Sequence, residues 1–163
     1  MGPQGKSRGP PGNNNNFNPN SYVTREEFVK MIVNAAGIQL VADGEGFADV
    51  DSSAWYAPYV YAAKANGIVN GTGANTFGIG SPISRQDMSV IINNIINIDA
   101  DISTNRDTFK DDANIADYAY ESVYSMKSLG ILNGYDSGEF NPRGQLTRAE
   151  AAKVIAMVMD IIR

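Results

Sequence analysis

The sequence contains no cysteine and no histidine in its 163 residues. Without cysteine there is no disulfide bond and no thiol nucleophile, and without histidine the commonest general base of hydrolases is missing. The same two residue types supply most protein ligands of zinc. The acidic residues are scattered, so no pair stands out as the acid and base of a glycoside hydrolase. We therefore expect no enzyme, no bound metal and no cofactor.

Long apolar runs and basic blocks are lacking as well. No apolar run reaches the roughly 18–20 residues that a membrane-spanning helix needs, and residues 1–22 lack the apolar centre of a signal peptide. The net charge is −5 and the pI is about 4.6, which disfavours capture of nucleic acid or of an anionic membrane. We expect neither as a partner. If the protein is exported, its signal lies outside this sequence.

One motif occurs three times, at residues 17–27, 77–87 and 140–150. Each copy has an aromatic residue seven positions before a Thr or Ser, and an aliphatic residue directly before that hydroxyl. Arg follows the hydroxyl residue, and an acid stands three positions after it. Beyond each copy, apolar residues recur at the spacing of one helical face. Three equivalent faces predict three helices that pack around one core.

A second block precedes two of these copies, at residues 47–71 and 109–134. It runs from Phe-x-Asp through a short helical segment, headed by Trp55 or Tyr118, to a Gly-Ile-x-Asn-Gly turn. Glycine stops the helix, and at most a short β-hairpin follows. The predicted fold class is therefore mostly α, with tandem helix-turn-helix repeats.

The two blocks divide the chain into a tail, a half-repeat and two full repeats. Residues 1–16 are rich in Gly, Pro and Asn, a composition typical of a flexible tail or linker. Residues 17–46 form a partial repeat that has only the second half. Residues 47–106 and 107–163 form the second and third repeats.

These motifs resemble the S-layer homology repeat of bacterial cell-surface proteins. The matching features are Phe-x-Asp-Val followed by Trp-Tyr-Ala, the Gly-Ile-Val-Asn-Gly turn, Phe-Asn-Pro, and the Thr-Arg-Ala-Glu signature at 147–150 with its variants at 24–27 and 84–87. The resemblance covers residues 17–163, and the ordered series at about 60-residue spacing is far more specific than any single motif. It implies a pseudo-threefold arrangement around a central three-helix bundle of Thr-Arg helices.

The resemblance also implies a function, that of a non-catalytic anchoring module outside the cell, at the bacterial cell wall. In the family, grooves between neighbouring repeats bind secondary cell-wall polysaccharide, often through the carboxylate of a pyruvyl group. A pyruvylated amino sugar is then the implied ligand. If nothing replaces the missing first half-repeat, one groove is incomplete. Arg25 follows no first helix, so its groove is the least secure of the three.

Arg25, Arg85 and Arg148 are the leading candidates for ligand contact. Each lies in the first turn of its predicted helix, where a cation opposes the helix dipole by about 0.3–1 kcal/mol. An anionic ligand would offset that cost, since helix N–H groups and an Arg fork together suit a carboxylate. The alternative is that each Arg pairs with an acid of the neighbouring repeat, such as Asp49 or Asp111.

The other candidate ligand-binding residues surround these arginines in the motifs. The hydroxyl residues fit capping boxes with the acids that follow them. The rings of Trp55 and Tyr118 suit stacking on a sugar or partial packing in the core. The Asn-Gly pairs of the turns allow close backbone approach, although a positive-φ turn is a sufficient explanation. Besides the two rings, these candidates are Thr24, Ser84, Thr147, Asn70, Gly71, Asn133 and Gly134.

A second function, from a different class, stays open at this point. The chain would be a structural assembly module of an S-layer or surface filament, and its partners would be other copies of the chain or other surface proteins. A helix from another chain would then complete the missing half-repeat, with the collagen-like tail as a spacer.

Overall fold

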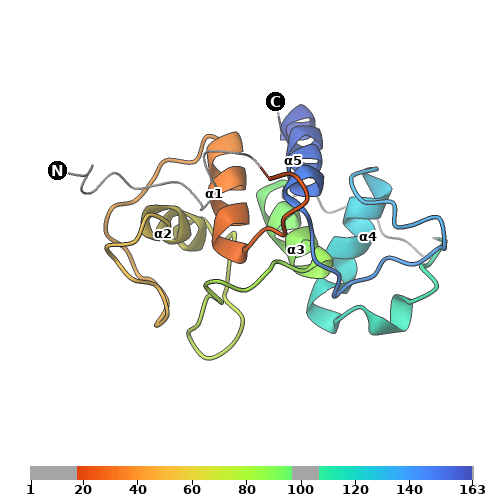
Figure 1. The fold of residues 1–163 in the computed structure, drawn as a ribbon, viewed down its shortest axis with the longest axis horizontal. Helices are drawn as coiled ribbons and strands as arrows, with labels where there is room; N and C mark the ends of the chain where they lie inside the picture. Colours follow the sequence, from red (N-terminus) through yellow and green to blue (C-terminus); the bar gives the residue numbers. More distant parts are fainter. Residues whose placement is uncertain (1–17, 97–106, 163) are drawn as a thin grey trace.

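The computed structural model describes residues 18–96 and 107–162, and this part of the chain is mostly helical (Figure 1). Instead of hairpin strands, the described residues contain only isolated β-bridges. The mostly α fold class is thus confirmed, while the predicted tail and the predicted boundary at residue 106 lie outside the described residues. The elements are α1 (Arg25–Ala35), α2 (Ala57–Ala65), α3 (Arg85–Ile96), η2 (Asp112–Asn114), η3 (Asp117–Ala119), α4 (Tyr120–Ser128) and α5 (Arg148–Ile162).

Three of the helices, α1, α3 and α5, begin directly after the hydroxyl residue of a motif copy. Thr24 Oγ1 accepts from the N–H of Glu27, whose carboxylate accepts from the N–H of Thr24 at 3.2 Å, so the capping box is complete. Ser84 and Thr147 accept from the N–H three residues further on, at 3.1 and 3.2 Å. The predicted caps are confirmed at all three hydroxyls, and each satisfies a backbone donor that the helix itself leaves unpaired.

The three motif copies are joined head to tail by backbone hydrogen bonds. In each copy the N–H of the motif arginine donates to the carbonyl that lies three residues before the hydroxyl of the next copy. The pairs are Arg25 with Ser81 (2.9 Å), Arg85 with Gly144 (2.9 Å) and Arg148 with Ser21 (2.8 Å). Because the third copy donates to the first, the bonds form a closed ring with approximate threefold symmetry.

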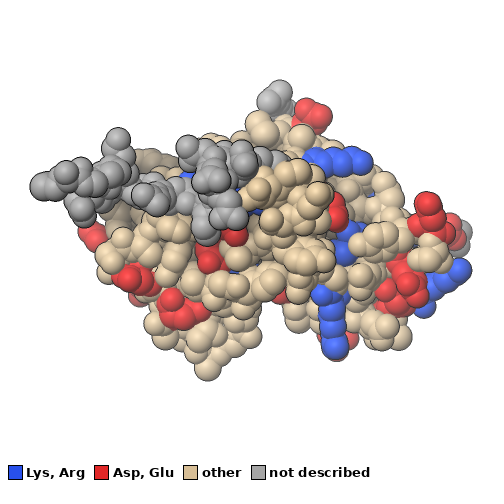
Figure 2. Space-filling view, in the orientation of Figure 1, with Lys and Arg blue, Asp and Glu red and all other residues tan. Residues whose placement is uncertain are grey.

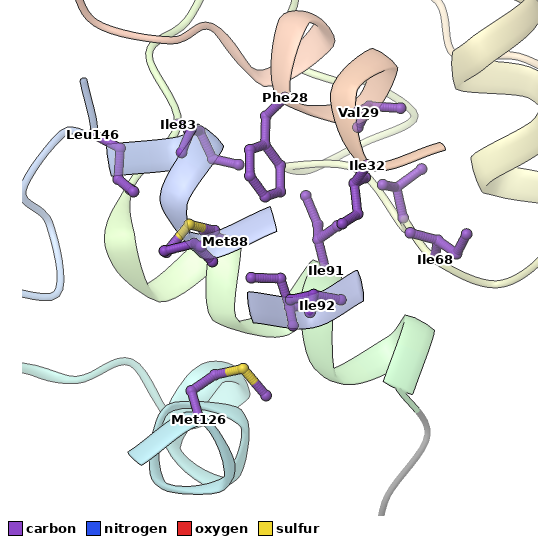
Figure 3. Packing of buried hydrophobic residues seen from close by; sticks show 14 of the residues in the cluster. Phe28, Val29, Ile32, Ile68, Ile83, Met88, Ile91, Ile92, Met126 and Leu146 are labelled. Atoms are coloured by element: carbon purple, nitrogen blue, oxygen red, sulfur yellow. The ribbon is translucent and has the colours of Figure 1, made fainter. Parts of the chain in front are cut away.

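The hydrophobic core lies where the three motif copies meet. The aliphatic residues that precede the hydroxyls, Val23, Ile83 and Leu146, are all 0% exposed. α5 packs against both α1 and α3, and large side chains such as Phe28 and Met88 fill the space between α1 and α3 (Figure 3). The helices of the three copies therefore share one core, as their common apolar face predicts.

The first helix of each full repeat packs against the motif helix of the preceding repeat. α2 contacts α1 and α4 contacts α3, while neither packs on the motif helix of its own repeat. As a result α2 and α4 lie toward opposite ends of the molecule (Figure 1). The structural neighbour of a motif helix is thus the helix that follows it in the chain.

The acids of the two Phe-x-Asp segments hold the turn at the aromatic residue of the next motif. Asp49 accepts from the N–H groups of Phe77, Gly78 and Ile79 at 2.7, 2.8 and 3.0 Å. Desolvation of the carboxylate raises its pKa, but these backbone hydrogen bonds together bring the pKa of Asp49 below its ordinary value of 3.8. Asp111 does the same in the third repeat, accepting from two backbone N–H groups at 2.8 Å.

Replacing this carboxylate tests its role in holding the turn. Asp49→Ala is expected to lower the free energy of unfolding at pH 7 by about 1–3 kcal/mol, because three backbone donors lose their acceptor. Since the folded-state pKa is depressed, the stabilisation is complete above about pH 4 and disappears as the pH falls through the folded-state pKa. Urea unfolding of wild type and variant from neutral to acidic pH measures this. Asp136→Ala, at an exposed turn, is the control, and a pH-independent loss would contradict the prediction.

Candidate functional site

Each motif arginine reaches the capping acid of the next motif copy. Arg25 Nη1 donates to Asp87 at 2.9 Å, Arg85 Nη1 lies 3.8 Å from Glu150, and Arg148 Nη1 donates to Glu27. These pairs follow the same cyclic order as the backbone ring. The arginines therefore do pair with acids of the neighbouring repeat, but Asp49 and Asp111 were the wrong partners to expect. A capping acid on the adjacent helix offsets the unfavourable place of each cation in its helix dipole.

Arg25 and Arg85 are also held by a main-chain carbonyl of the next repeat. Arg25 Nε donates to the carbonyl of Phe77 at 2.9 Å, and Arg85 Nε donates to that of Phe140 at 2.8 Å. Both arginines are only 6% exposed, and each guanidinium lies over the ring of the same phenylalanine. The two side chains therefore join adjacent repeats, whatever else they contact.

A groove of about 450 Å³ lies beside Arg25, and three repeats contribute to it. The first repeat supplies Arg25, and the second supplies the turn at 68–72 and the side of α3 that carries Asp87, Val90 and Ile91. The third repeat supplies Tyr118. Four of the predicted site residues thus come together here, namely Arg25, Asn70, Gly71 and Tyr118.

Tyr118 lines this groove and is joined through its hydroxyl to another lining residue, Asp87. The hydroxyl donates to Asp87 at 2.5 Å, while 65% of the residue stays exposed. Desolvation of the hydroxyl and then its bond to the Asp87 carboxylate raise the pKa of Tyr118 to about 12, so the phenol stays neutral at physiological pH. Asp87 is held between a cation and a phenol, and the exposed ring face is available to a ligand.

A second groove, of about 230 Å³, lies at the equivalent position beside Arg85. Its turn is 130–134, which brings in the predicted residues Asn133 and Gly134, and its helical wall is the side of α5 with Glu150, Lys153 and Met157. No residue in the described part of the chain takes the place in this groove that Tyr118 has in the Arg25 groove. The Arg85 groove is therefore smaller, and it carries Lys153 where the Arg25 groove carries an apolar residue.

Among the described residues, Arg148 and Trp55 line neither of these grooves. Lys30, one helical turn after Glu27, has its Nζ 5.4 Å from the centre of the Trp55 ring. By the threefold relation these residues occupy the positions of a third groove, for which the described part of the chain supplies no Gly-Ile-x-Asn-Gly turn. The expectation that Arg25 has the least secure groove was wrong, because the walls beside an arginine come from the following repeats.

The glycines of both turns have a structural reason that is independent of any ligand. Gly71 and Gly134 have φ angles of 88° and 78°. A Cβ atom on Gly71 would lie 2.4 Å from the carbonyl oxygen of Thr76, and one on Gly134 would lie 2.7 Å from the ring of Phe109. The positive-φ turn therefore explains these glycines, while the neighbouring Asn70 and Asn133 are exposed to solvent.

The helical walls of the grooves were missing from the sequence prediction. Asp87 and Glu150 were interpreted only as caps, and the positions one turn further on, Val90 and Lys153, received no role. The signal was present in the helical period, since a residue three positions after the capping acid lies on the same face. Thr24, Ser84 and Thr147 act as caps and line neither groove in the described structure.

Comparison with known families accounts for this arrangement of repeats. A sequence model of the S-layer homology domain matches residues 11–29, 46–89 and 108–152, which together are more than half of the chain. The chain belongs to the S-layer homology family. The first matched segment is the shortest of the three.

Relatives of this S-layer homology chain are much longer proteins. An amylopullulanase of Thermoanaerobacterium thermosulfurigenes is 36% identical over 147 residues, which cover 88% of this chain and 8% of that protein. Exoglucanase XynX of Acetivibrio thermocellus is 35% identical over 147 residues, with 88% and 13% covered. An S-layer protein of Bacillus thuringiensis subsp. finitimus is 28% identical over 141 residues, with 86% and 17% covered. The chain thus spans less than a fifth of each of these proteins.

Two further findings concern the described residues of this S-layer homology chain. None of the helices in that part combines the length and apolar character needed to cross a membrane. The same part of the chain brings no three or more His, Cys, Asp or Glu side chains together in a way that could hold a metal ion.

The three ion pairs between motif copies should contribute unequally to stability. Glu27 has a side chain only 8% exposed against Arg148, so Glu27→Gln should lower the free energy of unfolding by about 2–5 kcal/mol. Glu150 is 46% exposed and 3.8 Å from Arg85, so Glu150→Gln should cost less than about 1 kcal/mol. Urea unfolding of both variants at pH 7 measures the difference. Equal losses would show that the two pairs are equivalent and would contradict this structure.

Proposed function

We propose that this S-layer homology chain is a non-catalytic anchoring module that binds an anionic, pyruvylated secondary cell-wall polysaccharide at the bacterial cell surface. The observation that carries the proposal is the recurrence of one groove, with an arginine, an Asn-Gly turn and a helical wall, at two positions related by the ring. Membership of the family and the S-layer protein among its relatives support the location at the cell surface.

The Arg25 groove is better suited to the uncharged sugar rings of such a polymer than to its carboxylate groups. Its Arg25 already donates to Asp87 and to a main-chain carbonyl, and its helical wall carries Val90 and Ile91. The exposed ring of Tyr118 offers a flat apolar face, and the amide of Asn70 offers hydrogen bonds to hydroxyl or acetamido groups. Together these features favour an uncharged part of an amino sugar.

The Arg85 groove suits the carboxylate. Arg85 is 3.8 Å from Glu150, too far for a strong hydrogen bond, and Lys153 adds a second cation in the same groove. On the face shown in Figure 2, basic and acidic side chains are interspersed rather than gathered in a basic patch. Recognition of an anion by a chain of net charge −5 therefore has to be local, through groups such as these.

The lengths of the relatives suggest what such an anchor would hold. They include proteins named as an amylopullulanase, an exoglucanase and an S-layer protein, and this chain corresponds to a small part of each. An anchoring module of this kind would keep whatever is attached to it at the cell wall, and would leave any chemistry to the attached part.

Substitutions of groove residues that are not themselves members of the ion pairs test the proposal, and thermal unfolding verifies that each variant folds. Tyr118→Ala and Lys153→Ala should each weaken binding to purified cell walls by about tenfold, because one removes a stacking face and the other a charge-assisted hydrogen bond. Cosedimentation with cell walls over a range of protein concentrations measures the affinity. The matched controls are Tyr22→Ala and Lys110→Ala, which remove exposed side chains elsewhere and should bind like wild type.

Chemical removal of pyruvate from the cell walls tests the ligand itself. Binding of the wild-type chain should fall, and the Lys153→Ala variant should then bind no worse than wild type, since the carboxylate that Lys153 contacts is gone. Undiminished binding to pyruvate-free walls would exclude the carboxylate as the recognised group. Replacing all three motif arginines is a poor test, because those side chains join the repeats.

A further inference from the structure

The two groove arginines differ in how much of the guanidinium is engaged by the fold. Both donate through Nε to a phenylalanine carbonyl of the next repeat, Arg85 at 2.8 Å and Arg25 at 2.9 Å. Arg25 also donates through Nη1 to Asp87 at 2.9 Å, whereas Arg85 Nη1 stays 3.8 Å from Glu150. Within the described part of the chain, the bond through Nε is the only hydrogen bond that the Arg85 side chain donates. Its two Nη groups remain available to another acceptor.

A tyrosine ring lies beside the guanidinium of Arg85 but not beside that of Arg25. The Arg85 Cζ atom is 4.8 Å from the centre of the Tyr135 ring and 5.0 Å from that of Phe140. Among the described rings, Arg25 lies over that of Phe77 alone, at 5.2 Å. Two rings therefore contact the arginine whose ion pair is long, and one ring contacts the arginine whose ion pair is close.

The position of Tyr135 is fixed by the backbone of its turn. Its N–H donates to the carbonyl of Glu139 at 2.9 Å, and its carbonyl accepts from the N–H of Gly138 at 2.9 Å. At the equivalent position of the second repeat, the N–H of Thr72 donates to the carbonyl of Thr76 at 2.8 Å. The two turns thus share this hydrogen bond and differ in the side chain that follows the Asn-Gly pair.

A ring beside a guanidinium stabilises the cation without occupying its N–H groups. The face of the ring attracts the positive charge, while the N–H donors lie in the plane of the guanidinium. An acid has a different effect, because a carboxylate accepts from those same donors. Arg85, whose side chain is only 7% exposed, is therefore stabilised by two rings in place of a close ion pair.

We propose that Tyr135 is a positioning residue that holds Arg85 away from Glu150, so that the Nη groups of Arg85 stay available to a carboxylate carried by a sugar. This inference rests on the proposed function, since Arg85 and Lys153 line the groove assigned to the carboxylate. In the other groove, where Thr72 takes the place of Tyr135, the arginine is paired with its acid at 2.9 Å. The residue after the Asn-Gly pair thus determines which groove selects a carboxylate.

Titrations of the whole chain with two small glycosides test this role. One probe is a methyl glycoside of an N-acetylhexosamine that carries a pyruvate ketal, and the other is the same glycoside without the ketal. Two-dimensional NMR gives the Kd for each probe, and the same spectra verify that each variant folds.

Tyr135→Thr should lower the preference for the ketal, expressed as the ratio of the two affinities, by about tenfold. The reason is that Arg85 is then free to close on Glu150, as Arg25 closes on its own acid. Tyr135→Phe retains the ring and should keep the wild-type ratio. Tyr22→Thr, the same substitution at an exposed tyrosine that lines neither groove, is the matched control and should also keep it.

Removal of the acid distinguishes positioning of Arg85 from direct contact with the sugar. In a Glu150→Gln background, Tyr135→Thr should change the ratio by less than about twofold, because Arg85 no longer has a carboxylate to close on. If Tyr135 stacked on the sugar or served only the fold, the loss would be the same in both backgrounds. An equal loss, or an unchanged ratio for Tyr135→Thr in the wild-type background, would overturn the inference while leaving the proposed function intact.

A methyl glucuronide, as a third probe, distinguishes the source of the carboxylate. Tighter binding of the glucuronide than of the ketal, lost in Tyr135→Thr, would support the role of Tyr135 and overturn the pyruvyl group of the proposed function. A wild-type chain that binds neither acid better than the ketal-free glycoside would overturn both the inference and the carboxylate recognition on which it rests.

Discussion

Every repeat of this protein depends on the next for the start of its central helix. A helix leaves its first N–H groups without partners inside the helix, and here the first of them, on the motif arginine, donates to the loop of the next motif copy. The arginine side chain also contacts the next motif copy. It pairs with an acid there, and at Arg25 and Arg85 it donates to a main-chain carbonyl. The cyclic order means that removing one copy breaks two of the three junctions, so the three copies stabilise one another rather than folding as independent units.

Local features of the chain could be predicted from the sequence because their causes are local. The period of the apolar residues placed α1, α3 and α5, and the Thr or Ser before each arginine marked their caps. The partners of the arginines could not be predicted, because sequence distance does not say that a motif helix neighbours the following repeat. The walls of the grooves could not be predicted for the same reason. Arg25 was therefore assigned the least secure groove, although the second and third repeats supply the other residues that line it.

Most positions of each motif serve the fold, and one position differs between the grooves. The hydroxyl, the arginine and the acid serve the fold in every copy, and the glycines serve the turns. The position six residues after the hydroxyl varies, with Lys30, Val90 and Lys153 in the three copies, and two of these side chains line grooves. Within the motif helices, differences between otherwise equivalent grooves are therefore concentrated on partly buried or exposed helical positions that the ring does not use.

Because each first helix packs on the preceding motif helix, the structural repeat has different boundaries from the sequence repeat. In space, the unit is a motif helix with the first helix that follows it, so α1 with α2 and α3 with α4 are two whole units and α5 is half of a third. In a closed ring the order of the pieces matters less than their adjacency. A circular permutation that moves the opening of the chain from one junction to another should therefore preserve the fold, and a segment excised for transplantation is best cut inside a sequence repeat, before a motif.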